Sequence, residues 1–306
     1  MCRQLKGGGM EIIMKKFTGV MPALITPLNA DETINVPVLQ KQLADLMEEG
    51  ADGFYIGGAT GEGIALTAQA RKVLAEEAIQ FVNHRVPCIV HIASVNFAEA
   101  IELAKHAEAV GADAISAIPP MFFAYDVNDV YNYYKAIAEA VSIPLIVYYN
   151  PNAGFNMNAG IAAKMFEIEN VTGIKWTSSD YYGVVQLQNL TNGEMNIING
   201  PDEMLLMGLS AGCDGGIGST YNVMMPLIKA IYENFKAGNM AEALACQKKA
   251  DRIIAAILKW KVIPAIKVIL NARGYNVGEA AFPMTRYTEE EKAQILADVR
   301  EAGLEI

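Results

Sequence analysis

The feature that most constrains the fold is a regular alternation of short apolar runs with stretches of helical periodicity. Eight apolar runs are predicted to be strands: Gly19–Leu24, Gly53–Gly57, Cys88–Ala93, Ala114–Ile118, Leu145–Tyr149, Val171–Trp176, Met195–Ile198 and Gly215–Gly218. Segments with helical spacing follow them; in Pro37–Glu49, for example, Leu39, Leu43 and Leu46 fall near one face. Strands that are apolar on both faces are typical of parallel sheets covered by crossover helices. Eight such units close most naturally into a (β/α)8 TIM barrel.

The chain after the eighth run is predicted to be entirely helical. Its predicted helices are Pro226–Lys236, Met240–Trp260, Pro264–Ala272 and Glu289–Ala302. A linker rich in Pro, Gly and Ser is absent from the sequence, so we predict one catalytic barrel domain over residues 17–222. Residues 223–306 are predicted to form a C-terminal helical appendage, and residues 1–16 a flexible N-terminal extension.

Charge and composition exclude several classes of partner. The 306 residues carry 24 Lys and Arg against 34 Asp and Glu, a formal charge of −10. This acidity argues against a nucleic-acid binder, which needs clustered cations, and against binding to anionic membranes. The sequence shows no apolar run long enough to span a membrane, and it shows no signal peptide. Four scattered cysteines indicate free thiols, so we expect a cytoplasmic protein.

A lysine at the end of the sixth predicted strand is the first candidate for chemistry. In a (β/α)8 barrel the active site lies at the carboxyl ends of the strands. Strand alternation places Lys175 on the face opposite Trp176, so Lys175 is predicted to point into the barrel mouth. A desolvated lysine there could attack a carbonyl group and form a Schiff base. The alternative is a strand-end lysine whose ammonium group reaches solvent.

Two further segments follow predicted strands at the same end. Tyr148 and Tyr149 are adjacent, so at most one phenol enters the barrel as a proton shuttle, and the other packs on its neighbours. The glycine-rich loop 57–63 contains Thr60 and several backbone N–H groups that could hold a carboxylate or phosphate, although turn glycines are common. Its spacing fits neither a P-loop nor a dinucleotide-binding motif.

The remaining candidates have ordinary structural explanations as well. Three histidines lie in separate segments without a ligand motif, so we expect no metal and no cofactor. We interpret His91, within the third strand, as a core histidine. The adjacent Asp202 and Glu203 could cap the following helix or bind a substrate.

Taken together, these segments resemble the class I pyruvate-dependent aldolases, the N-acetylneuraminate lyase and dihydrodipicolinate synthase family. The likeness rests on the loop Gly57-Gly58-Ala59-Thr60-Gly61-Glu62, on Tyr148-x-x-Pro151 and on Gly173-Ile174-Lys175. It implies that Lys175 forms the Schiff base and that a tyrosine, Tyr148 by alignment of the strand, shuttles the proton. It also implies that Ala59, Thr60 and Gly61 bind the carboxylate of a 2-oxo acid.

The segments Asn199–Glu203 and Asp214–Asn222 resemble the N-acetylneuraminate lyase branch of that family. This resemblance implies a carbon–carbon lyase that cleaves N-acetylneuraminate to N-acetylmannosamine and pyruvate, and a homotetramer. It implies that the polyhydroxy chain of the sugar acid is held by Thr177, Gly200, Asp202, Glu203 and Ser219. The loop 152–154 has no arginine, whereas the synthase branch usually has one there.

Two departures from the family pattern keep other functions open. Ala59 stands where the branch usually has a serine or threonine, and Phe122 and Phe123 stand where the family usually has paired tyrosines. Phenylalanine cannot donate a proton, so Tyr125 would have to replace the missing phenol. One alternative is dihydrodipicolinate synthase or another 2-oxo-3-deoxy sugar acid aldolase. Another is a protein that binds a 2-oxo acid without catalysis.

Overall fold

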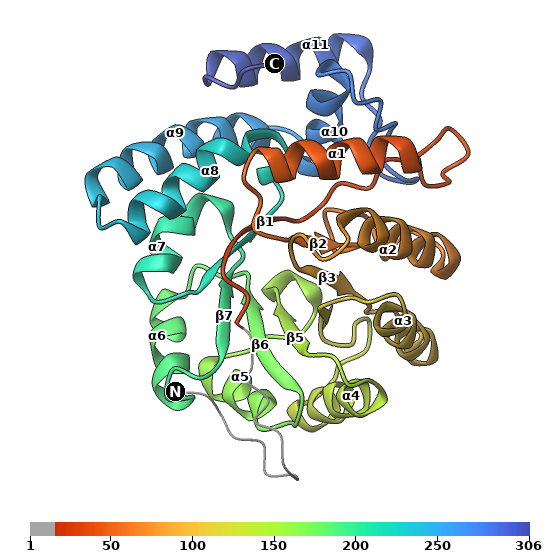
Figure 1. The fold of residues 1–306 in the computed structure, drawn as a ribbon, viewed down its shortest axis with the longest axis vertical. Helices are drawn as coiled ribbons and strands as arrows, with labels where there is room; N and C mark the ends of the chain where they lie inside the picture. The colour runs from red at the N-terminus through yellow and green to blue at the C-terminus, as the bar shows by residue number, and fades with distance from the viewer. Residues whose placement is uncertain (1–15) are drawn as a thin grey trace.

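The computed structural model describes residues 16–306, and within that range eight parallel strands form one sheet. The strands are β1 (Gly19–Pro22), β2 (Phe54–Ile56), β3 (Cys88–His91), β4 (Ala114–Ala117), β5 (Leu145–Tyr149), β6 (Val171–Trp176), β7 (Asn196–Asn199) and β8 (Gly215–Gly218). Their order is β1-β8-β7-β6-β5-β4-β3-β2. A parallel bridge between Ala23 and Tyr55 joins β1 to β2, so the sheet closes on itself. The predicted TIM barrel is confirmed (Figure 1).

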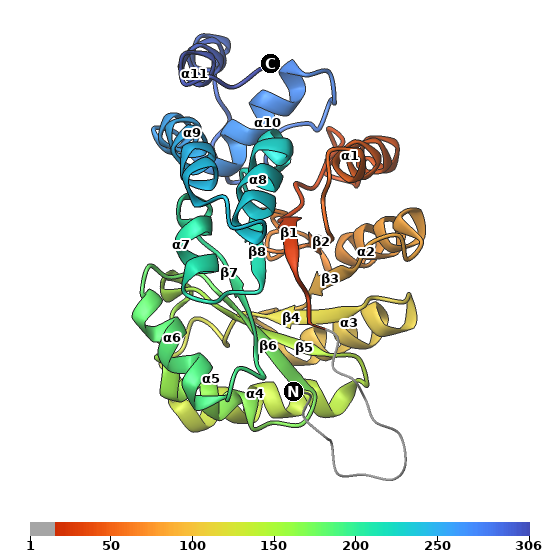
Figure 2. The same cartoon turned by 60° about the vertical axis from the view of Figure 1, so that its left-hand side comes forward.

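Helices alternate with the strands and cover the outside of the barrel (Figures 1 and 2). They are α1 (Val36–Glu48), α2 (Ala68–Val82), α3 (Phe97–Ala109), α4 (Val127–Ala140), α5 (Ala159–Phe166), α6 (Tyr181–Leu190), α7 (Leu205–Ser210) and α8 (Tyr221–Lys236). Short 3-10 helices, η1 (Pro151–Ala153) and η2 (Asp202–Met204), follow β5 and β7. Thr67 caps α2, because its side chain accepts a hydrogen bond from the backbone N–H of Ala70.

The predicted appendage begins in a different way from the expectation. We predicted a helix starting at Pro226, but α8 starts at Tyr221 and contains Pro226. Met224, two residues before the proline, has non-helical dihedral angles and divides α8 into two helical parts. Pro226 therefore lies in the first turn of the second part, where proline is tolerated, as expected for a helix that starts there. The predicted division between residues 222 and 223 therefore falls inside α8.

The last three helices are α9 (Met240–Leu258), α10 (Val262–Ala272) and α11 (Glu289–Glu301). They lie together beyond α8 on one side of the barrel in both views (Figures 1 and 2). Contacts of α8 with α9 and of α10 with both bind this group to the barrel. Among residues 16–306, no helix combines the length and apolarity needed to cross a membrane.

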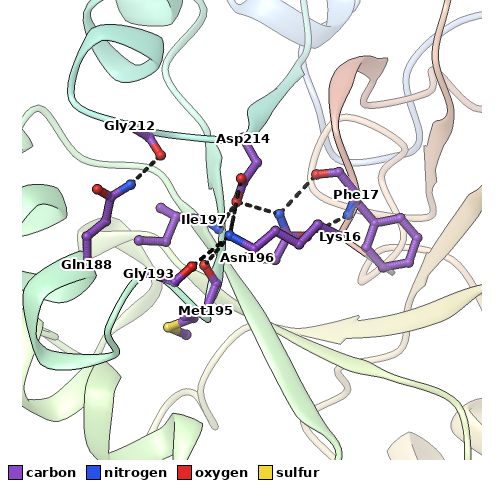
Figure 3. Close-up of polar contacts among 9 residues, drawn as sticks. All are labelled: Lys16, Phe17, Gln188, Gly193, Met195, Asn196, Ile197, Gly212 and Asp214. Atoms are coloured by element: carbon purple, nitrogen blue, oxygen red, sulfur yellow. Dashed lines mark hydrogen bonds and ion pairs between the residues drawn. The ribbon is translucent and has the colours of Figure 1, made fainter. Parts of the chain in front are cut away.

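Polar contacts fasten the segment before β1 to the amino-terminal end of the barrel (Figure 3). The side chain of Asn196 accepts a hydrogen bond from the Phe17 N–H at 2.9 Å and donates to the Phe17 carbonyl at 3.0 Å. Lys16 forms an ion pair with Asp214 at 3.3 Å, and Asp214 also accepts from Asn196. These bonds hold the segment before β1 against β7. The rest of the predicted extension, residues 1–15, lies outside the described residues.

Candidate active site

Lys175 lies on β6 with its side chain inside the barrel. Its neighbour Trp176 faces the other way, because a Cβ atom added at Gly183 on α6 would come within 3.2 Å of the indole ring. Lys175 is only 6% exposed, which is unusual for a lysine. The interpretation of a lysine that reaches solvent is therefore wrong, and the interior position predicted from strand alternation is confirmed.

Two tyrosine rings enclose the amine of Lys175. The Nζ atom lies 4.3 Å from the ring centroid of Tyr148 and 4.7 Å from that of Tyr55. Tyr55 belongs to β2, and its hydroxyl donates to the Ser116 Oγ atom on β4 at 3.0 Å. The sequence analysis did not identify Tyr55. Strand alternation contained the necessary information, since it predicts which β2 residues face the barrel interior.

The strand register distinguishes the two adjacent tyrosines. Tyr148 is paired with Lys175, whereas Tyr149 is paired with Trp176 and packs on its ring at a centroid distance of 4.7 Å. Burial by itself raises the pKa of the Tyr148 phenol, but the charge of Lys175 and hydrogen bonds with Asn150 and other neighbours outweigh it. The pKa of Tyr148 therefore lies below its ordinary value, which suits a group that accepts a proton from a substrate.

The glycine-rich loop after β2 is tightly folded. A Cβ atom at Gly63 would lie 1.8 Å from the carbonyl oxygen of Gly57, so only glycine fits there. The Thr26 hydroxyl donates to the carbonyl of Gly61 at 2.6 Å and ties the loop to the end of β1. Thr60 is buried, and its Oγ1 atom lies 2.6 Å from the Oγ atom of Ser219. The loop thus brings the hydroxyls of Thr60 and Ser219 together, although they lie 159 residues apart in the sequence. Both residues were predicted to bind substrate.

A pocket of about 410 Å³ opens over the ends of β5 to β8. It is lined by all five residues predicted to hold the polyhydroxy chain: Thr177, Gly200, Asp202, Glu203 and Ser219. Gly200 is required for the close approach, because a Cβ atom there would lie 2.1 Å from the Thr177 hydroxyl. The opposite wall is apolar and comes from α9 and α10, namely Ile254, Ile257, Leu258 and Val262. The sequence analysis missed this contribution of the C-terminal helices.

Asp202 is bound to the end of β8 instead of capping a helix. Its Oδ2 atom accepts hydrogen bonds from the backbone N–H and the hydroxyl of Thr220, both at 2.7 Å. Burial raises the pKa of Asp202 to about 6, although these bonds act in the opposite direction. Glu203, by contrast, is exposed at the rim. Of the two interpretations offered for this pair, helix capping by Asp202 is wrong.

Four further residues singled out from the sequence are Phe122, Phe123, Ala59 and His91. Phe122 and Phe123 are 87% and 66% exposed, and Phe123 packs edge-on against Tyr125. Ala59 is exposed on the glycine-rich loop. His91 is a buried core residue whose Nε2 atom accepts from the Ile118 N–H at 3.4 Å. Burial lowers the pKa of His91 to about 3, so its ring is neutral at neutral pH.

Replacing Asp202 by asparagine should remove a pH dependence of stability. The folded pKa of about 6 lies above the ordinary value of 3.8, so between these values the folded chain keeps a proton that the unfolded chain loses. Stability should therefore fall by about 2 kcal/mol as the pH rises from 4 to 7. In Asp202→Asn this contribution vanishes, so the variant gains relative to the parent at pH 7. Urea unfolding at both pH values measures it.

The exposed neighbour provides a matched control, because Glu203→Gln removes the same charge one residue away. A stability difference between Asp202→Asn and the parent that stays constant between pH 4 and pH 7 would contradict the raised pKa.

Comparison with known proteins assigns the chain to a family. Residues 16–302 match the model of the dihydrodipicolinate synthetase family. A protein named N-acetylneuraminate lyase from Clostridium perfringens (strain SM101 / Type A) is 34% identical over 284 residues, which cover 90% of this chain and 97% of that protein.

Solved structures from both branches share the fold. The Proteus mirabilis N-acetylneuraminate lyase superposes with a TM-score of 0.90 at 30% identity, covering 95% of this chain and all of that one. A dihydrodipicolinate synthase from Bacillus anthracis gives 0.89 at 25% identity, over 94% and 99% of the two chains. With a family match that spans the barrel and the C-terminal helices alike, the chain belongs to the dihydrodipicolinate synthetase family and is a carbon–carbon lyase of the aldolase type.

Proposed function

We propose that this protein is an N-acetylneuraminate lyase that works through a Schiff base on Lys175. The observation that carries the proposal is the position of the Lys175 amine, buried in the barrel and 4.3 Å from the ring of Tyr148. An amine attacks a ketone faster when it is held in position and shielded from bulk water, and the burial of Lys175 supports such shielding. A phenol beside the amine supplies the proton transfer.

The reaction follows from these groups. The Lys175 amine attacks the C2 ketone of open-chain N-acetylneuraminate, and water leaves to give a protonated imine. Tyr148 accepts the proton of the C4 hydroxyl while the C3–C4 bond breaks. The electron pair of that bond flows into the protonated imine. N-acetylmannosamine departs as the aldehyde. The remaining enamine is protonated at C3 and hydrolysed, which releases pyruvate and restores the amine.

The remaining site residues divide between the two ends of the substrate. The loop with Ala59, Thr60 and Gly61 binds the carboxylate next to the ketone. The pocket residues Thr177, Gly200, Asp202, Glu203 and Ser219 bind the polyhydroxy tail, and carboxylates with a hydroxyl suit a chain of alcohols. The names of the relatives support this substrate. We extend the proposal to a homotetramer in the cytoplasm, without a cofactor.

Dihydrodipicolinate synthase is the competing function, since synthase structures are also similar. A synthase needs a cation for the carboxylate of its second substrate. The pocket wall after β5 offers Asn150, Pro151 and Asn152 instead, and none of these is charged. This neutral wall favours an uncharged sugar tail over an anionic aldehyde.

Borohydride reduction in the presence of pyruvate should attach a stable adduct to Lys175. Reduction converts the imine to a secondary amine, so peptide mass spectrometry should find one reduced pyruvate on that residue. Lys175→Met should carry no adduct, and the exposed Lys41 serves as an internal control for nonspecific labelling. An unlabelled Lys175 would rule out the Schiff base.

The aldehyde partner can be assigned by condensation in the reverse direction. Purified protein with pyruvate should consume N-acetylmannosamine and leave aspartate semialdehyde unchanged, because the pocket wall after β5 is neutral. Turnover of aspartate semialdehyde instead would support the synthase. Pyruvate trapping without turnover of either aldehyde, or of a wider panel of sugars, would support a binding protein.

Removing the phenol of Tyr148 should separate proton transfer from imine formation. We expect Tyr148→Phe to lower kcat by about 10²- to 10⁴-fold, the usual contribution of a positioned acid–base group, while pyruvate is still trapped on Lys175. Tyr149→Phe is the matched control, because Tyr149 packs on Trp176 away from the amine. Equal losses in the two variants would refute the assignment of Tyr148 as the shuttle.

A further inference from the structure

A buried ion pair connects the glycine-rich loop to the C-terminal helices. The carboxylate of Glu62, in the loop after β2, lies 2.6 Å from the Nζ atom of Lys267 on α10. The two side chains are 0% and 2% exposed, the most deeply buried of the ion pairs in the described chain. None of the steps proposed above uses either group.

Each partner is also held by the backbone of the segment after α10. The second oxygen of Glu62 accepts from the Ala281 N–H at 2.5 Å, and Lys267 donates to the Glu279 carbonyl at 2.9 Å. The pair is thus embedded in a network that crosses from the barrel to the appendage. Burying two charges costs desolvation that their attraction barely offsets, so such a pair is a poor stabilising device. It is better suited to fixing one conformation.

The conformation that the pair can fix is that of the carboxylate-binding loop. Glu62 has a φ angle of +60°, a left-handed value that is unfavourable for a residue with a side chain. Gly61 before it is tied to Thr26, and Gly63 after it is pressed against Gly57. The strained residue therefore needs an anchor, and its own side chain provides one through Lys267. Thr60, two residues earlier, takes its position from this turn.

We propose that Glu62 and Lys267 are positioning residues that hold Thr60 and the loop backbone in place for the carboxylate of the 2-oxo acid. This inference rests on the proposed Schiff-base function. It gives the C-terminal helices a direct part in substrate affinity, although neither residue of the pair touches the substrate.

The test is the concentration of pyruvate that gives half-maximal trapping on Lys175 by borohydride. We expect Lys267→Met to raise this concentration about tenfold or more, because an unpaired buried carboxylate displaces the loop. The maximal trapped fraction should be unchanged, because Lys175 lies on β6 and keeps its own surroundings. Thermal unfolding of each variant measures the accompanying loss of stability.

Lys229→Met is the matched control, because it breaks an ion pair at the other end of β2. Lys229 forms an ion pair at 2.6 Å with Asp52, which lies just before β2, whereas Glu62 follows β2. We expect the control to lower the melting temperature and to leave half-saturation within about twofold of the parent. An equal rise in half-saturation in Lys229→Met would show a general effect of destabilisation and overturn the proposal.

The double variant Glu62→Gln with Lys267→Met keeps the test decisive if the single variant fails to fold. It removes both charges of this buried pair, so its melting temperature should return toward that of the parent. Half-saturation should stay raised several-fold, because the anchor is gone. If both the half-saturation concentration and the melting temperature returned to the parent values, the pair would be merely structural.

The two levels of the proposal fail in different ways. Trapping in the parent with an unchanged half-saturation in Lys267→Met would overturn the positioning role alone. An absence of trapped pyruvate in the parent would overturn the Schiff-base function, and this inference with it.

Discussion

Closure of the parallel sheet is the constraint on which the rest of this molecule depends. β1 pairs with β8 along four residues, and the bridge from Ala23 to Tyr55 joins it to β2. Because all strands run the same way, closure gathers their carboxyl ends around one mouth. Lys175, Tyr148 and the glycine-rich loop come from distant parts of the sequence and meet there for this reason. The polar contacts of Asn196 with Phe17 support the opposite end of the barrel.

The chemistry at the mouth depends on the enclosure that the barrel provides. Lys175 projects between the aromatic faces of Tyr55 and Tyr148, so its amine is shielded from bulk water on two sides. The same enclosure raises the pKa of Asp202 to about 6 and keeps His91 neutral. A closed, largely apolar interior therefore disfavours the charged forms of both Asp202 and His91.

Most of the fold could be predicted from local patterns, because each strand and helix is specified by its own residues. β5, β6 and β8 have the bounds that the apolar runs predict. Alternation along β6 also placed Lys175 and Trp176 correctly on opposite faces. Pro226 was correctly taken to lie in the first turn of a helix, but the part of α8 that starts at Tyr221 and ends at the kink at Met224 was missed.

The parts of the site that could not be predicted are those that need tertiary contacts. The bond from Thr220 to Asp202 joins residues that only the barrel brings together, and the apolar wall of Ile254, Ile257 and Leu258 comes from helices outside the alternation. Lys267 did leave a trace in the sequence, since it lies within the apolar stretch Pro264–Leu270. A lysine there needs a buried partner, by the same physical argument that identified Lys175.

The C-terminal helices therefore help to build the candidate site, together with the barrel. They supply one wall of the pocket and the cation that pairs with Glu62. An independent appendage would be expected to keep its charged groups at its own surface, where water solvates them at no cost. Here a lysine of α10 is buried against a loop of the barrel instead, so the docked helices supply the loop with a charged partner. The pocket and its anchor are assembled together, as products of the whole chain.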